Sequence, residues 1–143
     1  MPRIVVGVDG SAHSLAAVRW ACNEARLRGD QLELVAAWTI PAAALEVATD
    51  EVVEAMERSA AQALEAARAV VAECGPDLEV LQGVYDGQPA RILVERAKGA
   101  DLLVVGSRGL GDFKALLLGS VSQEASHHSP VPIVIIRNES REG

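Results

Sequence analysis

A group of glycines and serines near the carboxyl end of the chain has the residue types and spacing of a phosphate-binding loop. Its members are Gly106, Gly109, Gly111, Gly119, Ser120 and Ser122. Because glycine has no Cβ, backbone N–H groups can approach phosphate oxygens closely, and a helix beginning at Ser120 would add N–H groups and a positive dipole end. A second interpretation stays open: the glycines relieve turns, and Ser120 with Gln123 forms a capping box.

The best-known phosphate motifs do not occur in the sequence. No segment reads G-x4-G-K-[ST], and neither Gly7-Val-Asp-Gly10 nor Gly109-Leu-Gly111 extends to G-x-G-x-x-G. The loop is therefore neither a Walker loop nor a dinucleotide fingerprint. The spacing that the chain carries is Gly106-x2-Gly109-x9-Gly119-Ser120.

Strand-like and helix-like segments alternate along the chain and would position this loop. Short apolar runs predict strands at residues 4–8, 31–38, 78–84, 101–106 and 132–136. Apolar residues at helical spacing predict helices at residues 13–28, 50–74, 89–97 and 120–128. This alternation implies right-handed crossovers. We therefore expect a single α/β domain over residues 1–143, a doubly wound parallel sheet with helices on both faces.

The composition of the chain makes several classes of binding partner unexpected. The chain has 143 residues, half of them apolar, and a formal net charge of −7. Nucleic acids and anionic membranes are held chiefly through surplus lysine and arginine, so neither is an expected partner. No apolar run approaches the roughly 20 residues that cross a bilayer, and the amino terminus lacks signal-peptide organisation, so we expect a soluble cytoplasmic protein.

Cysteine and histidine give little support for a metal centre or a nucleophile. Cys22 and Cys74 lie on predicted helices without CxxC spacing and are expected to be buried free thiols. His127 and His128 are adjacent and lack i, i+4 spacing, so these histidines are expected at the surface or at a helix end, as is His13. No cysteine or histidine partner can be assigned to any serine, and no nucleophilic triad is predicted.

Several segments, in the right order along the chain, resemble the universal stress protein family. They are Val6–Ser11, Gly87-x-Pro89-Ala90, Ala100–Gly109 and Ser129–Ile136, together with the glycine spacing above. Similar proteins have an open five-stranded sheet in the order 3-2-1-4-5, and those with the full glycine spacing bind ATP. The resemblance therefore implies this strand order and an ATP site.

The resemblance also implies which residues form the site. Those expected against the phosphates and ribose are Gly106, Gly109, Gly119, Ser120 and Val121, with the hydroxyl of Ser122 as a further donor. Those expected on the adenine and ribose side are Val8, Asp9 and Ala37. In the order 3-2-1-4-5 the winding reverses between strands one and four, and open α/β sheets bind ligands at such a reversal.

Four side chains near this site have more than one interpretation. Asp9 is expected to contact the ribose or adenine, or to hold Mg²⁺, which would offset phosphate charge where basic side chains are few; capping of the next helix is the alternative. Arg108 and Lys114, the cations of the loop, stay open as phosphate contacts. Trp38, at the end of the second strand, stays open as a contact to adenine.

The apolar sequence of the last predicted strand indicates that two copies of the chain assemble. Residues Ile133–Ile136 form an uncharged apolar edge, and similar proteins dimerise through their last strands, so we expect a homodimer.

The expected function is a stress response in which occupancy by ATP biases conformation or partner choice. Two alternatives stay open: a slow ATPase or phosphoryl-transfer enzyme with Ser120 or Ser122 as phosphoacceptor, and a dimerisation module without ligand. The choice among ATP, AMP and cyclic nucleotides is also open.

Overall fold

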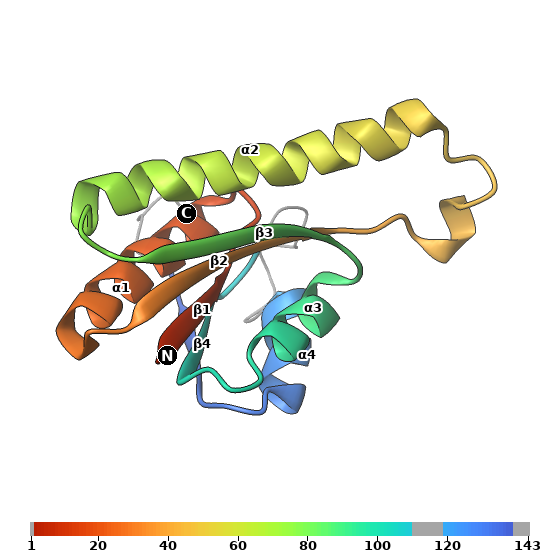
Figure 1. The fold of residues 1–143 in the computed structure, drawn as a ribbon. Coiled ribbons are helices and arrows are strands. Elements are labelled where there is room, and N and C mark those ends of the chain that lie inside the picture. Colours follow the sequence, from red (N-terminus) through yellow and green to blue (C-terminus); the bar gives the residue numbers. More distant parts are fainter. Residues whose placement is uncertain (1, 110–118, 139–143) are drawn as a thin grey trace.

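The computed structural model describes residues 2–109 and 119–138. Its strands are β1 (Arg3–Gly7), β2 (Gln31–Trp38), β3 (Val80–Asp86), β4 (Leu102–Gly106) and β5 (Ile133–Ile136). Its helices are α1 (Ala12–Arg28), α2 (Asp50–Cys74), α3 (Pro89–Arg96) and α4 (Ser120–His128), with a 3-10 turn at Ala42–Ala44. The strands pair in parallel in the order β3-β2-β1-β4-β5, which confirms the predicted fold and strand order (Figure 1).

Alternate side chains of the sheet pack into two different helical layers. Ile4 and Val6 of β1 belong to the core that α1 and α2 cover, whereas Val5 packs with Leu93 of α3 and Ala125 of α4. Successive side chains of a strand point to opposite faces, so a strand covered on both faces needs a continuous apolar run. Figure 1 shows these two layers, with α1 and α2 on one face of the sheet and α3 and α4 on the other.

The limits of β3 differ most from the sequence expectation. The strand predicted at residues 78–84 lies at Val80–Asp86. The N–H of Leu78 donates to the carbonyl of Gly75 at 3.0 Å, so the chain is still turning after α2 at that point. At the other end, Asp86 continues the ladder opposite Trp38. The limits of β2 and α2 agree with the prediction.

Helix caps explain where the helices begin. The Ser11 hydroxyl accepts from the N–H of Ser14 at 3.1 Å and caps α1, and Thr49 caps α2 in the same way. In α4 the cap position belongs to Gly119, no side chain makes a capping bond, and Ser120 is already helical. The capping-box interpretation of Ser120 is therefore wrong.

The two cysteines lie at the packed boundary between α1 and α2. Both are free, as expected, but only Cys22 is fully buried; Cys74 ends α2 and is half-buried. Burial, followed by the neighbouring Cys74 thiol, raises the pKa of the Cys22 thiol to about 12. Because the thiolate is the reactive form, this burial disfavours thiol chemistry at Cys22.

Candidate functional site

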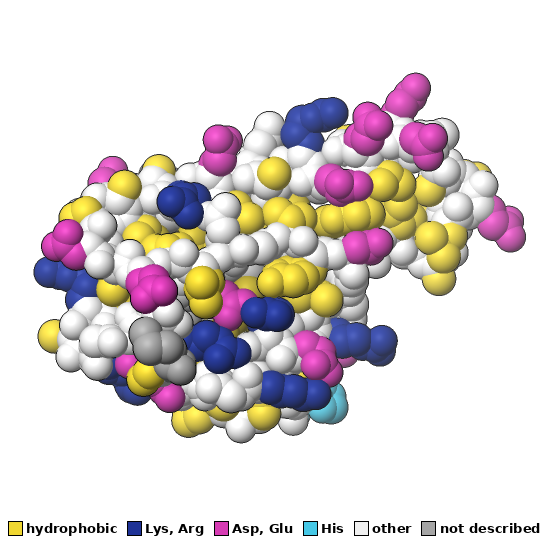
Figure 2. Space-filling view, viewed as in Figure 1, with side chains coloured by type: hydrophobic (Ala, Val, Ile, Leu, Met, Phe, Trp, Pro, Cys, Tyr) yellow, Lys and Arg dark blue, Asp and Glu magenta, His cyan; other side chains and the backbone are white. Residues whose placement is uncertain are grey.

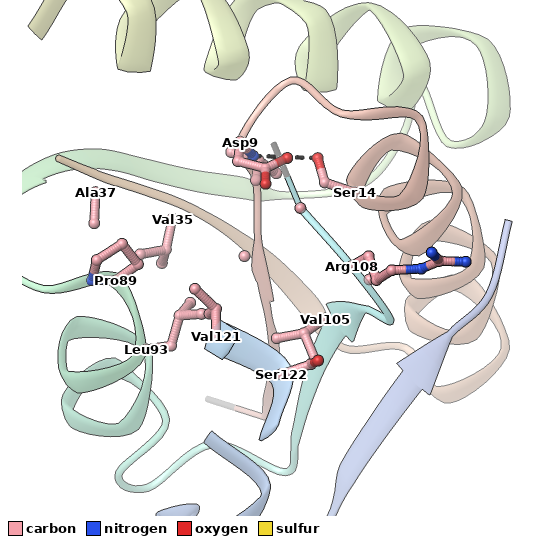
Figure 3. Close-up of a pocket in the computed structure, with 14 residues that line it drawn as sticks. Asp9, Ser14, Val35, Ala37, Pro89, Leu93, Val105, Arg108, Val121 and Ser122 are labelled. Carbon is pink, nitrogen blue, oxygen red and sulfur yellow. Dashed lines mark hydrogen bonds between the residues drawn. The ribbon is translucent and has the colours of Figure 1, made fainter. Parts of the chain in front are cut away.

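A pocket opens at the carboxyl ends of β1, β2 and β4, where α3 and α4 approach the sheet (Figure 3). Its volume is about 210 Å³. The lining residues are Gly7, Val8, Asp9, Ser14, Val35, Ala37, Pro89, Leu93, Val105, Gly106, Arg108, Gly109, Val121 and Ser122. The pocket lies where the winding of the sheet reverses between β1 and β4, which is the position at which open α/β sheets bind ligands.

One wall of the pocket is apolar. Val35 and Ala37 come from β2 and face the same side of the sheet because they are two residues apart. Pro89 and Leu93 come from successive turns of α3, and Val121 comes from α4 (Figure 3). An apolar wall of this kind suits the face of a planar, largely apolar group.

The opposite side of the pocket is polar and includes Asp9. Its Oδ1 accepts from the N–H of Ser11 at 2.8 Å, and its own N–H donates to the Ser14 hydroxyl at 3.2 Å. These bonds fix the turn between β1 and α1. Ser11 caps α1, so the capping role is not that of Asp9, which supports the turn and is one of the residues that line the pocket.

Gly7 keeps the floor of the pocket open at the end of β1. A Cβ placed on this residue would lie 2.8 Å from Cδ1 of Leu93, closer than side chains normally approach. A larger residue here would displace the Leu93 side chain, which is part of the apolar wall. Glycine at the last position of β1 therefore allows α3 to approach the sheet closely.

The two ends of the glycine-rich loop are held together by hydrogen bonds. The N–H of Gly119 donates to the carbonyl of Ser107 at 2.6 Å. The buried Ser122 hydroxyl donates to the carbonyl of Ser107 at 3.0 Å and to that of Gly119 at 3.1 Å. The end of β4 and the start of α4 therefore form a closed base for the loop, with Ser122 both in that base and in the pocket lining.

His13 links the same region to the end of β5. Its Nδ1 accepts from the N–H of Asn138 at 3.2 Å and lies 3.2 Å from the Ser107 hydroxyl oxygen. His13 is half-buried in the first turn of α1, while His127 and His128 are exposed at the end of α4. The expectation of surface or helix-end histidines is confirmed, and the contact of His13 with Ser107 was not foreseen.

Most of the residues predicted for the site meet at this pocket. Those that line it are Val8, Asp9, Ala37, Gly106, Gly109, Val121 and Ser122. Gly119 and Ser120 lie at the start of α4, outside the lining. The lining residues that sequence reasoning missed are Gly7, Ser14, Val35, Pro89, Leu93 and Val105. The alternation of β2 could have indicated Val35 from Ala37, and the matched segment Gly87-x-Pro89-Ala90 could have indicated Pro89.

The structure places some of the remaining candidate residues at the pocket and others away from it. Arg108 lines the pocket, and its side chain extends away from Ala37 (Figure 3). Trp38 packs against the α1–α2 core and is not part of the lining. Gly111 and Lys114 lie outside the described residues. Among residues 2–109 and 119–138, no three histidine, cysteine or acidic side chains gather as a metal cluster.

Comparison with known proteins decides the family. The family description that matches residues 1–137 is that of the universal stress protein family. The chain belongs to this family. This universal stress protein domain is 38% identical over 148 residues to a universal stress protein of Mycolicibacterium smegmatis, a match that covers 96% of the chain and 49% of that protein. The chain spans about half the length of the curated relatives it matches.

Two solved structures extend the comparison. Universal stress protein UspA from Lactobacillus plantarum is 25% identical to this universal stress protein domain, with a TM-score of 0.78 over 95% of the chain and 97% of its own. A universal stress protein solved in complex with cAMP is 32% identical, with a TM-score of 0.64 over 96% of the chain and 97% of its own. The fold is shared with both, and the second relative holds an adenine nucleotide.

Proposed function

We propose that this domain binds ATP or a closely related adenine nucleotide in the pocket at the carboxyl ends of β1 and β4. One observation carries the proposal: a single pocket at the winding reversal combines an apolar wall with a polar side that leads to the glycine-rich loop. A nucleotide needs both surfaces, since its base is flat and partly apolar and its phosphates need N–H donors. The relative that was solved with cAMP supports the ligand class.

The dimensions of the pocket suggest how the nucleotide lies. Its volume of about 210 Å³ is below the range of roughly 300–1,000 Å³ that is typical of sites enclosing whole ligands. We therefore place adenine and ribose inside, between Ala37, Pro89 and Val121, with Asp9 toward the ribose. The phosphates extend along Gly106 and Gly109 toward the amino terminus of α4, where Gly119 and Ser120 stand.

The donor set suits Mg²⁺ with a bound triphosphate. Mg²⁺ typically takes one or two carboxylates, phosphate oxygens and several waters. Asp9 is the only carboxylate in the pocket lining over the described part of the chain, which matches this demand. Asp9 would hold the ion, and the ion would neutralise phosphate charge in a domain with a net charge of −7.

Binding accounts for the pocket better than fast catalysis does. The Ser122 hydroxyl donates its hydrogen bonds to the backbone carbonyls of Ser107 and Gly119, and these bonds close the loop base. No histidine or lysine is found in the pocket lining among the residues that the structure describes. We infer that nucleotide occupancy acts on the loop between β4 and α4 and thereby biases conformation or partner choice in a stress response.

Two measurements test this proposal. Protein purified without added nucleotide and then denatured should release an adenine nucleotide, detected by ultraviolet absorbance and anion-exchange chromatography. An ADP-release assay under multiple-turnover conditions should show no rate above buffer. Sustained turnover would instead identify an ATPase or phosphoryl-transfer enzyme, and protein that neither carries nor takes up nucleotide would be a dimerisation module without ligand.

We further propose that the domain forms a homodimer through β5 in the cytoplasm. The Ile133–Ile136 side chains are only half-buried, and β5 lies at one edge of the sheet. Pairing with a second copy would bury this apolar edge. No helix of the described residues has the length and apolarity needed to cross a bilayer. Light scattering at micromolar concentration should give twice the mass of the chain, and a monomer mass would contradict the dimer.

A further inference from the structure

The apolar stripe of α2 continues beyond the sheet that it covers. Residues Ala60, Leu64 and Val71 of this stripe are buried against the sheet and α1. Val53 and Met56 continue the same stripe at helical spacing toward the amino terminus, yet burial falls off from there. Figure 1 shows the reason: the first turns of α2 and the connection from β2 project past the carboxyl ends of the strands.

This projecting part exposes several large apolar side chains. Val47 is 77% exposed, Leu45 is 60% exposed and Val52 is 44% exposed. Together with the half-buried Val53 and Met56 they form a surface that we call the α2 ledge. In Figure 2, hydrophobic side chains gather beneath the amino-terminal half of α2 and on the connection before it. Large apolar side chains gathered at the surface in this way are typical of interaction sites.

Acidic side chains border the α2 ledge. They are Glu46, Asp50, Glu51, Glu54 and Glu57, all exposed. Between residues 41 and 58 the sole basic residue is Arg58. Over residues 2–109 and 119–138, none of these five carboxylates takes part in an ion pair. Figure 2 shows acidic side chains along the outer side of the same projection.

The negative charge along the border of the α2 ledge determines which class of partner can cover it. A second copy that docked through its own ledge would bring another set of carboxylates to the same place, and like charges across an interface are unfavourable. An anionic membrane is disfavoured for the same reason. A basic partner satisfies both parts of the surface, because its apolar residues meet the ledge and its lysines and arginines meet the carboxylates.

We propose that the α2 ledge docks a basic amphipathic helix of a partner protein. Such a helix lays apolar side chains at positions i, i+3, i+4 and i+7 on an apolar floor, and its charged flanks pair with the rim. The apolar floor supplies most of the affinity, while the acidic rim sets the orientation and the association rate. The observations that support this docking surface are separate from those that support the nucleotide site.

The test uses the whole chain and a labelled synthetic peptide. The probe is a leucine–lysine helix of about eighteen residues, which makes five turns, with leucine on one face and lysine on the other. Fluorescence anisotropy should show saturable binding. Binding should weaken in about 0.5 M salt, because the Debye length is then shorter than its value of ~8 Å in physiological salt. A peptide of the same composition in scrambled order should bind at least about tenfold more weakly, a difference of ~1.4 kcal/mol.

Variants locate the binding on the ledge. Val52→Asp and Val47→Asp should each raise the Kd for the probe at least about tenfold. Position 52 is the third residue of α2, where an acidic side chain suits the helix dipole, so the fold should persist and far-ultraviolet circular dichroism should be unchanged. Glu51→Lys combined with Glu54→Lys should also weaken binding and reduce its salt dependence.

The matched control is Leu27→Asp, since Leu27 is 84% exposed near the end of α1 and is not part of the ledge. Its Kd should stay within about twofold of the wild-type value. The proposal is overturned if the wild type does not bind the probe, if the scrambled peptide binds equally well, or if Leu27→Asp weakens binding as much as Val52→Asp does.

Discussion

Gly106 and His13 lie against each other where β4 ends and α1 begins. A Cβ placed on Gly106 would be 2.8 Å from the carbonyl carbon of His13 and 2.9 Å from its carbonyl oxygen. These are backbone atoms of a helix, so they cannot move aside as the end of a flexible side chain can. The close approach places the start of the glycine-rich loop beside the turn that holds Asp9, and it brings both sides of the pocket together.

The first prediction concerns this contact. Gly106→Ala should lower the free energy of unfolding by about 1–3 kcal/mol, because the added methyl group overpacks the β4–α1 contact. Gly7→Ala is the comparison, since its Cβ would meet only the flexible Leu93 side chain and should cost less. Urea unfolding of both variants measures the difference. Equal losses, or no loss at Gly106, would contradict the account of this contact.

A second prediction separates the two roles of Asp9. Asp9→Asn keeps the side-chain oxygen that accepts from the Ser11 N–H, so stability should be nearly unchanged, whereas Asp9→Ala should lose about 1 kcal/mol. Both variants should lose the strengthening of ATP binding by Mg²⁺. Titrations with Mg²⁺ and with EDTA measure this effect. If Asp9→Asn keeps the full Mg²⁺ effect, the carboxylate does not hold the ion.

The third prediction addresses a buried carboxylate that anchors α3. Glu33 is 2% exposed and accepts from Arg3 Nε at 3.0 Å and from Arg96 Nε at 2.8 Å. Glu33→Gln should cost about 2 kcal/mol, less than for a fully buried pair because both guanidinium groups reach solvent. Urea unfolding measures the loss. Glu24→Gln, which breaks an exposed i, i+4 pair with Arg28, should leave the denaturation midpoint unchanged; a matching loss there would contradict the importance of burial.

The fourth prediction is a pH dependence from Asp30. Burial, and then the hydrogen bond and charge of the Asp101 carboxyl group, raise the pKa of Asp30 above its ordinary value, while Arg28 opposes the shift. A raised folded-state pKa means that the stability from the protonated group is present below the pKa of an unfolded aspartate. This stability is lost as the pH rises through the folded-state pKa.

Asp30→Asn removes that titration and should therefore melt at a higher temperature than the wild type at pH 7. The difference between the two melting temperatures should shrink as the pH falls to about 4, near the ordinary aspartate pKa. Differential scanning fluorimetry across this range measures it. Asp77→Asn, at an exposed position, should follow the wild-type curve. A difference between Asp30→Asn and the wild type that stays constant with pH would rule out the shift.

The sequence predicted elements well where local signals agree. The limits of α2 follow from its apolar stripe, the acidic residues Asp50 and Glu51 in its first turn and the Gly75-Pro76 stop. The predicted limits of β3 come too early in the chain because the backbone still turns at Leu78. Apolar residues in such a turn have the same pattern as those in a strand.

The residues that line the pocket likewise fall into those that could be predicted from the sequence and those that could not. The family resemblance implied Val8 and the strand order, and with that order Asp9 and Gly106 follow from the ends of the first and fourth strands. Ser14 and Leu93 reach the pocket only because of how α1 and α3 pack on the sheet, and this packing has no local signature. The contact of Ser107 with His13 likewise joins residues far apart in the chain.

The most direct test of the central claim is isothermal titration of ATP with Mg²⁺ into the wild type and into Ala37→Phe. Ala37 lines the apolar wall and is only half-buried, so phenylalanine there should fill the pocket without unfolding the sheet. We predict saturable binding of one ATP per chain to the wild type and a Kd at least about tenfold higher, ~1.4 kcal/mol weaker, for Ala37→Phe. A wild type that does not bind, or a correctly folded Ala37→Phe that binds with unchanged Kd, would contradict the site.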